Sequence, residues 1–250
     1  MGLDLGNCGL EVASRTDRGV SARANCLALR SELSGPALLR VLNGASPEIF
    51  CRAATPIPDE FRVRRAVRRV YRYYEPLRGV DAERRARAAR LFTGTIDVRS
   101  FGRGLPSAVA CLREVESVSI VLSQGGYVIE VRAPSFVWGM VRKIVAALRE
   151  YDSGRVSLAE LSAALRGEIR LPLPLAEPER LILWEVEYPV TWKYRWSGPN
   201  RHQSRWIRAT VDGLWSRARV VEAFPNPGAA REQTAAVRPR SGSRSSGEAA

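Results

Sequence analysis

Short stretches in which apolar and polar residues alternate recur along the chain, and this is the pattern of strands that bury one face of a sheet. The clearest pair is joined by Gln124, Gly125 and Gly126, a connection typical of a β-hairpin. We predict strands at Gly9 to Ser14, Ala22 to Leu29, Glu48 to Ala54, Val67 to Tyr74, Val115 to Leu122, Tyr127 to Val131 and Leu181 to Val186.

Helical periodicity is strongest where Phe136, Met140, Ile144 and Leu148 recur at four-residue spacing. This stripe predicts a helix with one buried face from Phe136 to Glu150. Capping residues predict three more helices: one from Ser34 to the stop at Asn43 and Gly44, one from Asp81 to Leu91, and one from Leu158 to Leu165 behind Ser157. Since hairpins and helices mix without regular βαβ repeats, we expect an α+β fold.

The balance of charges points to a polyanionic partner. Basic residues outnumber acidic ones by 39 to 26 among 250 residues, which gives a formal net charge of +13. This excess favours nucleic acid or an anionic membrane surface, and we interpret it in favour of nucleic acid. No apolar run approaches the about 18 residues of a membrane span, and no signal-peptide pattern opens the chain. We therefore expect a cytoplasmic protein without membrane contact.

Few residues are available for metal-dependent or histidine-dependent catalysis. His202 is the only histidine, and the four cysteines are scattered without a C-x-x-C pair. A Ser-His-Asp or Cys-His mechanism is therefore disfavoured, and a metal site is hard to build. Catalysis would rest on carboxylates, arginines and tyrosines, so we expect neither a metal nor a small-molecule cofactor.

The string from Arg15 to Val20 is the most informative in the sequence, because it places Asp17 between Arg15 and Arg18 ahead of Gly19. In one interpretation this is an ordinary turn, in which Asp17 caps backbone amides and Gly19 supplies a positive φ. In the other, the guanidinium groups hold Asp17 ionised and attract phosphate, which suits a reaction at a sugar carbon.

The segment Ala13 to Ala22 resembles the signature loop of the tRNA pseudouridine synthase A family, in which the aspartate of Arg-Thr-Asp-Arg-Gly-Val is catalytic. Further segments resemble family landmarks in the same order: Val70 to Tyr73, Asp97 to Phe101, Phe136 to Arg142, and Ala176 to Tyr188. The resemblance thus runs from about residue 9 to residue 190. The aromatic extension from Thr191 to Phe224 suggests an archaeal-type member, and the segment before the loop is shorter than in the family, which indicates a short N-terminus.

The resemblance implies a role for each candidate site residue. Asp17 would act at C1′ of a uridine, as a nucleophile or by way of a glycal intermediate. Tyr71, otherwise an ordinary strand tyrosine, would stack on the flipped base. Arg142, otherwise a solvated helix arginine, would pair with Asp17. Arg15 and Arg18 would contact RNA phosphate or position the loop.

The resemblance also implies a fold and partners. The expected architecture is the pseudouridine synthase fold, with two ferredoxin-like halves and mixed or antiparallel sheets around a basic cleft. The implied substrate is the anticodon stem-loop of tRNA, and the implied assembly is a homodimer. We predict an N-terminal α/β half at residues 1–65 that carries the catalytic loop, a C-terminal α+β half at 66–190, an aromatic and basic extension at 191–224, and a disordered tail at 225–250.

Two alternatives remain open from the sequence. The chain is short before the catalytic loop, where the family has a further strand, so an inactive tRNA-binding relative that acts as an RNA chaperone is one rival. A structural RNA-binding protein is the other. Formation of pseudouridine separates both rivals from the enzyme.

Overall fold

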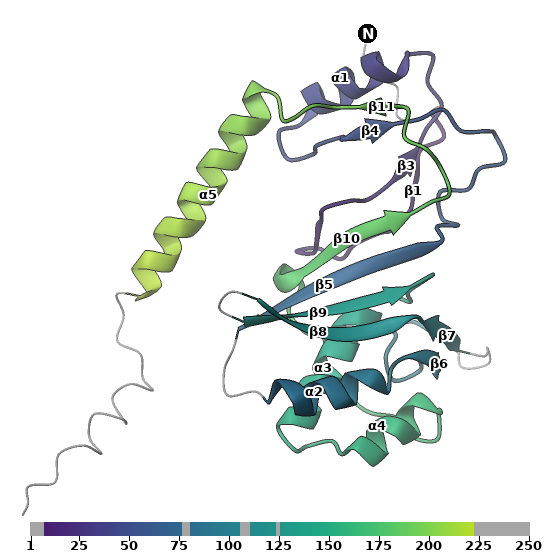
Figure 1. Cartoon of the computed structure of the whole chain (residues 1–250), viewed down its shortest axis with the longest axis vertical. Helices are drawn as coiled ribbons and strands as arrows, with labels where there is room; N and C mark the ends of the chain where they lie inside the picture. The colour runs from purple at the N-terminus through teal and green to yellow at the C-terminus, as the bar shows by residue number, and fades with distance from the viewer. Residues whose placement is uncertain (1–7, 77–80, 106–110, 124–125, 223–250) are drawn as a thin grey trace, which may run out of the picture. The chain divides into compact units, whose positions relative to one another are not determined.

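The computed structural model describes residues 8–76, 81–105, 111–123 and 126–222, with side chains as far as residue 218 (Figure 1). The chain forms two compact units. Unit 1 comprises Met1–Glu32 and Ile57–Thr191, and unit 2 comprises Leu33–Pro56 and Trp192–Ala250.

Unit 1 is built on a five-stranded mixed sheet (Figure 1). Its strands are antiparallel to their neighbours except for β2, which runs parallel to β10. The hairpin of β8 and β9, at one edge of the sheet, confirms the predicted one, although its turn at residues 124–125 lies outside the described residues. The order across the sheet is β2 (Ser21–Ala22), β10 (Leu181–Glu187), β5 (Arg68–Pro76), β9 (Gly126–Ala133) and β8 (Ser117–Ser123).

Helices and two small strand pairs complete unit 1. Helix α2 contacts both α3 and β8, so the helices cover one face of the sheet. The remaining elements are β1 (Glu11–Val12) paired with β3 (Leu27–Ala28), β6 (Gly94–Asp97) paired with β7 (Leu112–Val115), α2 (Ala82–Arg90), α3 (Met140–Asp152), α4 (Leu158–Leu165) and the 3₁₀ turn η1 (Pro178–Arg180).

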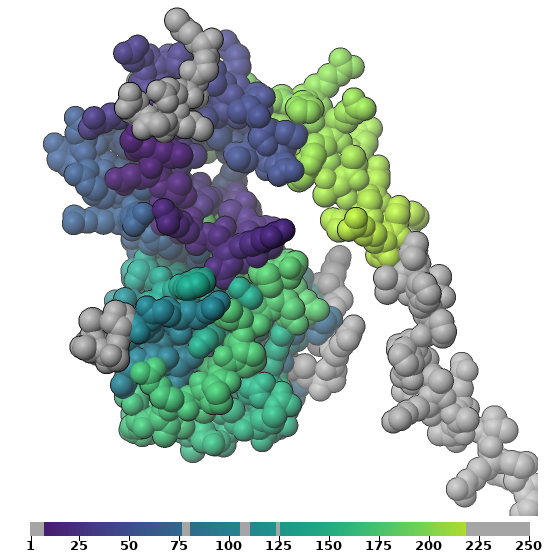
Figure 2. All heavy atoms as spheres, turned by 180° about the vertical axis from the view of Figure 1, so that it is seen from behind, coloured from purple at the N-terminus to yellow at the C-terminus, as the bar shows by residue number. Residues whose placement is uncertain are grey.

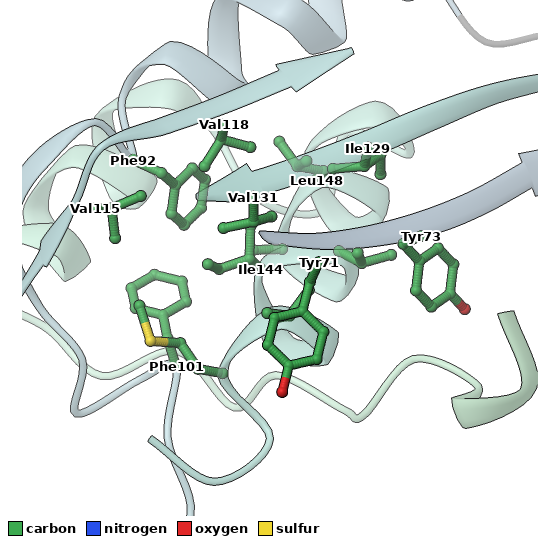
Figure 3. Packing of buried hydrophobic residues seen from close by; sticks show 14 of the residues in the cluster. Tyr71, Tyr73, Phe92, Phe101, Val115, Val118, Ile129, Val131, Ile144 and Leu148 are labelled. Atoms are coloured by element: carbon green, nitrogen blue, oxygen red, sulfur yellow. The ribbon is translucent and has the colours of Figure 1, made fainter. Parts of the chain in front are cut away.

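The core lies between the sheet and α3. Tyr71 and Tyr73 project from the same face of β5, as the strand alternation predicted, and both are buried. Figure 3 shows Tyr71 next to Ile144 of α3, and Ile144 and Leu148 of this helix are fully buried. Burial of side chains of this size stabilises a core by about 1.5–3 kcal/mol each, so this interface holds β5 and α3 in fixed register.

Two of the three predicted helix caps form, whereas the Ser34 side chain makes no capping hydrogen bond. The Asp81 side chain accepts a hydrogen bond from the Arg84 amide at 2.9 Å. Ser157 and Glu160 form a reciprocal capping box at the start of α4. These local signals define both helix starts without help from the rest of the fold.

The longest predicted helix begins later than its periodicity indicated. Helix α3 starts at Met140, not at Phe136, because Gly139 has a left-handed φ of 74° that no α-helix accommodates. Phe136 instead lies in the preceding loop, where its ring meets Tyr71 edge-on at 5.0 Å between centroids. The apolar residues at four-residue spacing therefore comprise one loop residue, Phe136, and three residues on one face of α3.

Several predicted strands are shorter than the alternation suggested. Gly9 to Ser14, Ala22 to Leu29 and Glu48 to Ala54 each contribute strands of only two residues. The predicted strand Val115 to Leu122 is interrupted at Glu116, because β7 pairs with β6 while β8 pairs with β9. Alternation marks apolar sides, but pairing partners decide where a ladder ends.

Unit 2 contains α1 (Gly35–Ala45), the paired strands β4 (Ala53–Ala54) and β11 (Tyr194–Arg195), and α5 (Arg201–Glu222). Buried amides connect these elements: Gln203 donates to the Asn43 side chain at 3.1 Å and to the Ile49 carbonyl at 2.9 Å. Asn200 and Gln203 also cap α5 reciprocally. The predicted aromatic and basic extension thus contains a long helix.

The expected α+β class is confirmed by these mixed sheets and helices. Unit 1 takes in most of residues 1–65 and all of 66–190, while unit 2 combines 33–56 with the extension. The division into ferredoxin-like halves at 1–65 and 66–190 stays a prediction. The predicted disordered tail at 225–250 lies outside the described residues. Among the helices in the described part of the chain, none is long and apolar enough to cross a membrane.

Candidate active site

The Asp17 loop is a tight turn. The Val20 amide donates to the Asp17 carbonyl at 3.0 Å, and Gly19 in the third position has a φ of 90°. A positive φ at this position is the geometry of a type II turn, which glycine adopts without strain. A Cβ at Gly19 would also approach Pro178 Cγ to 3.0 Å. Both constraints explain why glycine follows the Asp-Arg pair.

The Asp17 carboxylate is held at both oxygens. Its Oδ1 accepts a hydrogen bond from Trp138 Nε1 at 2.7 Å, and its Oδ2 accepts one from Arg142 Nη1 at 2.6 Å. The side chain is 23% exposed, so it stays accessible. Two donors that face one carboxylate restrict its rotation and leave it oriented toward the adjacent cavity.

Arg142 is itself fixed by a second contact. It lies in the first turn of α3 with a side chain only 13% exposed. Its Nε donates to the Ala176 carbonyl at 2.6 Å, while Nη1 reaches Asp17. A guanidinium with two fixed acceptors is pre-organised for the pairing. The predicted contact between Arg142 and Asp17 is therefore present in the structure.

Tyr71 lies beside the Asp17 loop. Burial raises the pKa of its phenol, and a hydrogen bond with Ser14 and the charge of Arg69 oppose that rise only in part. The hydroxyl is therefore neutral at physiological pH. Its ring lines the same cavity as Asp17, with Phe136 edge-on behind it. The aromatic group is thus placed where a planar ligand could stack.

The cavity has a volume of about 570 Å³. Asp17, Tyr71, Arg142 and Arg15 all line it, so the structure brings four of the five candidate residues together. Arg18 is exposed on the turn and is outside the set of described residues that line the cavity. The residues that could meet an anionic ligand there are arginines, which accords with the expected basic cleft.

A buried arginine holds the strand that leads into the loop. Arg69 donates from Nε to Ser14 Oγ at 3.0 Å and from Nη2 to the Ala13 carbonyl at 3.1 Å. It also donates to the carbonyls of Arg64 and Pro134. Arg69 thereby ties residues 13–14 to two other loops around the cavity, so the position of Asp17 depends on β5.

A polar cluster fixes the segment around Ala176, whose carbonyl accepts the hydrogen bond from Arg142. Glu177 Oε2 accepts hydrogen bonds from Tyr73 Oη at 2.8 Å and from Arg149 Nη1 at 2.7 Å. Arg149 lies two turns after Arg142 on α3, and it also pairs with Glu75. The backbone amide of Glu177 and these two donors lower the pKa of Glu177 to about 2. The cluster therefore fixes the carbonyl at residue 176 against α3.

We expect Glu177→Gln to lower the free energy of unfolding by about 0.5–1 kcal/mol at pH 7, a small value because the Glu177 side chain is 54% exposed and solvent screens its charge. A carboxyl with a depressed pKa contributes its full stability above its ordinary value near 4.5 and loses it as the pH falls toward 2. Urea unfolding of both proteins between pH 7 and pH 2.5 measures this difference. The exposed Glu60→Gln is the matched control, and a difference that does not shrink in acid contradicts the prediction.

Trp138 is the residue that sequence reasoning missed as a site residue. It lies within the segment Phe136 to Arg142, where the predicted helix would place it one turn before Arg142. The left-handed Gly139 instead turns the chain so that the indole reaches Asp17, while Arg103 stacks on the exposed ring at 4.4 Å. A tryptophan followed by glycine ahead of a basic helix was the available signal.

Metal ligands are not gathered in the described residues, where no group of three or more histidine, cysteine, aspartate or glutamate side chains could hold an ion. The groups next to Asp17 are an indole, a guanidinium and a phenol. They are suited to hydrogen bonding, charge stabilisation and stacking.

Comparisons with known proteins agree with this geometry. A family model described as tRNA pseudouridine synthase matches residues 88–189. The chain is 39% identical over 182 residues to the tRNA pseudouridine synthase A of Thermococcus gammatolerans, covering 71% of this chain and 67% of the relative. It is 40% identical over 182 residues to that of Thermococcus kodakarensis, with coverage of 71% and 67%. It is 30% identical over 230 residues to that of Methanosphaerula palustris, covering 88% and 81%.

The α+β fold and the family match place the chain among the pseudouridine synthases. It belongs to the tRNA pseudouridine synthase A family. The predicted resemblance is confirmed, and the relatives named here are archaeal proteins, as the archaeal-type interpretation anticipated.

Proposed function

We propose that Asp17 is the nucleophile with which this chain converts a uridine in the anticodon stem-loop of tRNA into pseudouridine. Family membership makes the chain an isomerase that acts on uridine in tRNA. The observation that carries the assignment of Asp17 is its carboxylate, held between Trp138 and Arg142 at the wall of a cavity that Tyr71 also lines.

The chemistry follows from this arrangement. A carboxylate oxygen of Asp17 attacks C1′ as the C1′–N1 bond breaks, and uracil leaves with the electron pair. The base rotates, C5 attacks C1′, and the bond to Asp17 breaks. The proton lost from C5 is balanced by the proton gained at N1, so the product is an isomer of the substrate. Arg142 and Trp138 stabilise the carboxylate each time it is released.

The other candidate residues have supporting roles. Tyr71 stacks on the flipped base, since its buried ring lines the cavity and replaces a stacking partner that the base loses on extrusion. Arg15, at the cavity wall, contacts the phosphate of the target nucleotide. Arg18, exposed on the turn, contacts a more distant phosphate or positions the loop.

We expect Trp138→Phe to lower kcat by about 10- to 100-fold, the scale of losing one hydrogen bond to a reacting carboxylate. Phenylalanine keeps an aromatic ring for Arg103 but removes the donor to Asp17 Oδ1. Single-turnover pseudouridine formation on a tRNA transcript measures the effect. Trp215→Phe, an exposed tryptophan on α5, is the matched control. Equal rates for wild type and Trp138→Phe would show that the indole contact is irrelevant to the reaction.

Mapping of pseudouridine on unmodified tRNA transcripts tests the proposed function. We expect new pseudouridine in the anticodon arm after incubation with the full chain. Pseudouridine elsewhere in the tRNA contradicts the anticodon assignment but leaves the enzyme in place. Tight tRNA binding without product favours the RNA chaperone instead.

We further propose a homodimer, which the family resemblance implies. Its support in this chain is α5, on which Ile207, Val211 and Leu214 recur at helical spacing and are exposed. Exposed apolar stripes of this kind are typical of contact surfaces. Sedimentation equilibrium is expected to give twice the monomer mass of 27.7 kDa, and a monomer at micromolar concentration contradicts this proposal.

A further inference from the structure

A second hollow of about 430 Å³ adjoins the Asp17 cavity in unit 1. The two share Val12, Arg15 and Arg64 in their linings, so they lie next to each other and have a wall in common. Figure 2 shows the purple N-terminal residues next to the blue residues of the segment near residue 60. We call this hollow the arginine groove, and its charged lining residues are Arg15, Arg62, Arg64, Arg65 and Glu11.

The backbone under the groove is fixed. Val63 is buried, with 1% exposure, and its carbonyl accepts a hydrogen bond from the Tyr188 hydroxyl. The carbonyl of Arg64 accepts one from Arg69 Nη2 at 2.8 Å, and the Arg65 amide closes a turn onto Arg62. The inward Val63 therefore anchors the loop while the neighbouring arginine side chains point outward and are exposed.

Positive charge in the groove is left uncompensated. Four guanidinium groups face one carboxylate, that of Glu11. Elsewhere in unit 1, Arg72, Arg132 and Arg149 pair with glutamates within 2.7 Å. Within the described residues, no carboxylate lies within ion-pair distance of the four groove arginines. Arg62 Nη1 donates to the backbone carbonyls of Asp59 and Phe61 at 2.7 and 3.1 Å, which are neutral acceptors. Clustered arginines whose charge meets no carboxylate partner favour an anionic ligand.

We propose that the arginine groove binds the backbone phosphates of the nucleotides that flank the target uridine. This inference rests on the proposed function, since a uridine that enters the Asp17 cavity remains joined to both neighbours through its phosphates. Arg15 and Arg64 lie on the wall that the cavity and the groove share, so a strand that leaves the cavity past them enters the groove. Beyond that wall, Arg62 and Arg65 meet the next phosphates, and the planar guanidinium matches phosphate oxygens in bidentate geometry.

A charge-removal pair tests the groove. Arg62→Gln/Arg65→Gln removes two cations that line the groove but not the Asp17 cavity. Arg87→Gln/Arg90→Gln removes two exposed cations from α2 and is the matched control. Equilibrium binding of an unmodified tRNA transcript is measured against salt concentration, with thermal unfolding to verify folding. We expect the groove variant to reduce the slope of log K against log salt by about 1.4, the value for two lost single-strand phosphate contacts, and the control to leave it unchanged.

Two further measurements sharpen the result. Glu11→Gln removes the carboxylate that opposes phosphate in the groove, so it is expected to tighten binding by about two- to fivefold. An anticodon stem-loop RNA with neutral methylphosphonate linkages at the next phosphates, one nucleotide beyond the converted uridine on both sides, is expected to weaken wild-type binding. The same linkages should weaken RNA binding by Arg62→Gln/Arg65→Gln much less, because these phosphate contacts are already absent in that variant.

The outcomes separate the two proposals. If the groove variant has the same salt slope as the control variant and the wild type forms pseudouridine, the groove proposal is overturned. The enzyme assignment then remains intact. The groove proposal is also overturned if the neutral linkages weaken RNA binding as much in the groove variant as in the wild type. Arg62 and Arg65 would then contact phosphates elsewhere. If the wild type forms no pseudouridine on the unmodified transcript, the proposed function is overturned. This measurement is independent of the binding slopes.

Discussion

Asp17→Asn is expected to abolish pseudouridine formation, lowering the single-turnover rate by at least about 10⁴-fold. Asparagine has nearly the shape of aspartate and keeps an oxygen for Trp138 or Arg142, but its amide is not a nucleophile toward C1′. The loop should therefore keep its conformation while the reaction stops. Rates are measured by pseudouridine mapping of a transcript with enzyme in excess.

Binding of tRNA provides the internal control for this variant. Removing a negative charge from a cavity that meets RNA does not weaken phosphate contacts, so the Kd of Asp17→Asn should lie within about threefold of the wild-type value. Asp212→Asn, the same substitution on the exposed surface of α5, should change neither rate nor binding. Substantial activity in Asp17→Asn would sink the nucleophile assignment.

Arg142→Gln is expected to give the second largest effect, a loss of about 10²- to 10³-fold in kcat. The substitution removes the donor to Asp17 Oδ2 and the positive charge beside it, leaving Trp138 as the remaining donor described at this carboxylate. It also removes the contact to the Ala176 carbonyl. Since Arg142 acts through Asp17, kcat should fall much more than KM rises.

Rescue and coupling distinguish this role from a purely structural one. Arg142→Lys retains the charge but cannot reach both Asp17 and Ala176 with a fixed fork, so we expect partial recovery of about tenfold over Arg142→Gln. Combining Arg142→Gln with Asp17→Asn should cost no more than Asp17→Asn alone, because residues that act as a unit are non-additive. Arg155→Gln, which breaks the exposed pair with Glu150, is the matched control. Two results together would contradict a role for Arg142 in positioning Asp17. Arg142→Lys and Arg142→Gln would lower kcat/KM equally, and the decrease would come from a higher KM with kcat unchanged.

The site depends on strands and helices that are distant in sequence. Asp17 and Arg142 are separated by 125 residues, and Asp17 and Trp138 by 121. The buried Arg69 holds the loop from β5, and the cluster around Glu177 holds the Ala176 carbonyl from α3. The geometry of one carboxylate is thus maintained by the packing of β5 on α3.

Much of the local structure was readable from the sequence alone. The caps at Asp81 and Ser157, the alternation that buries Tyr71 and Tyr73, and the hairpin of β8 and β9 all depend on residues close together in the chain. For this reason short-range rules sufficed for them. The same holds for the turn at Asp17, whose string also identified the family.

Other features were decided by tertiary structure. Periodicity carried the predicted helix through Gly139, because a hydrophobic stripe contains no record of a left-handed φ. The predicted strand is divided at Glu116 because β7 pairs with β6 whereas β8 pairs with β9. The indole of Trp138 became a donor to Asp17 only when β5, α3 and the loop packed together. Sequence thus determined the elements and the candidate carboxylate, whereas long-range packing determined which side chains meet it.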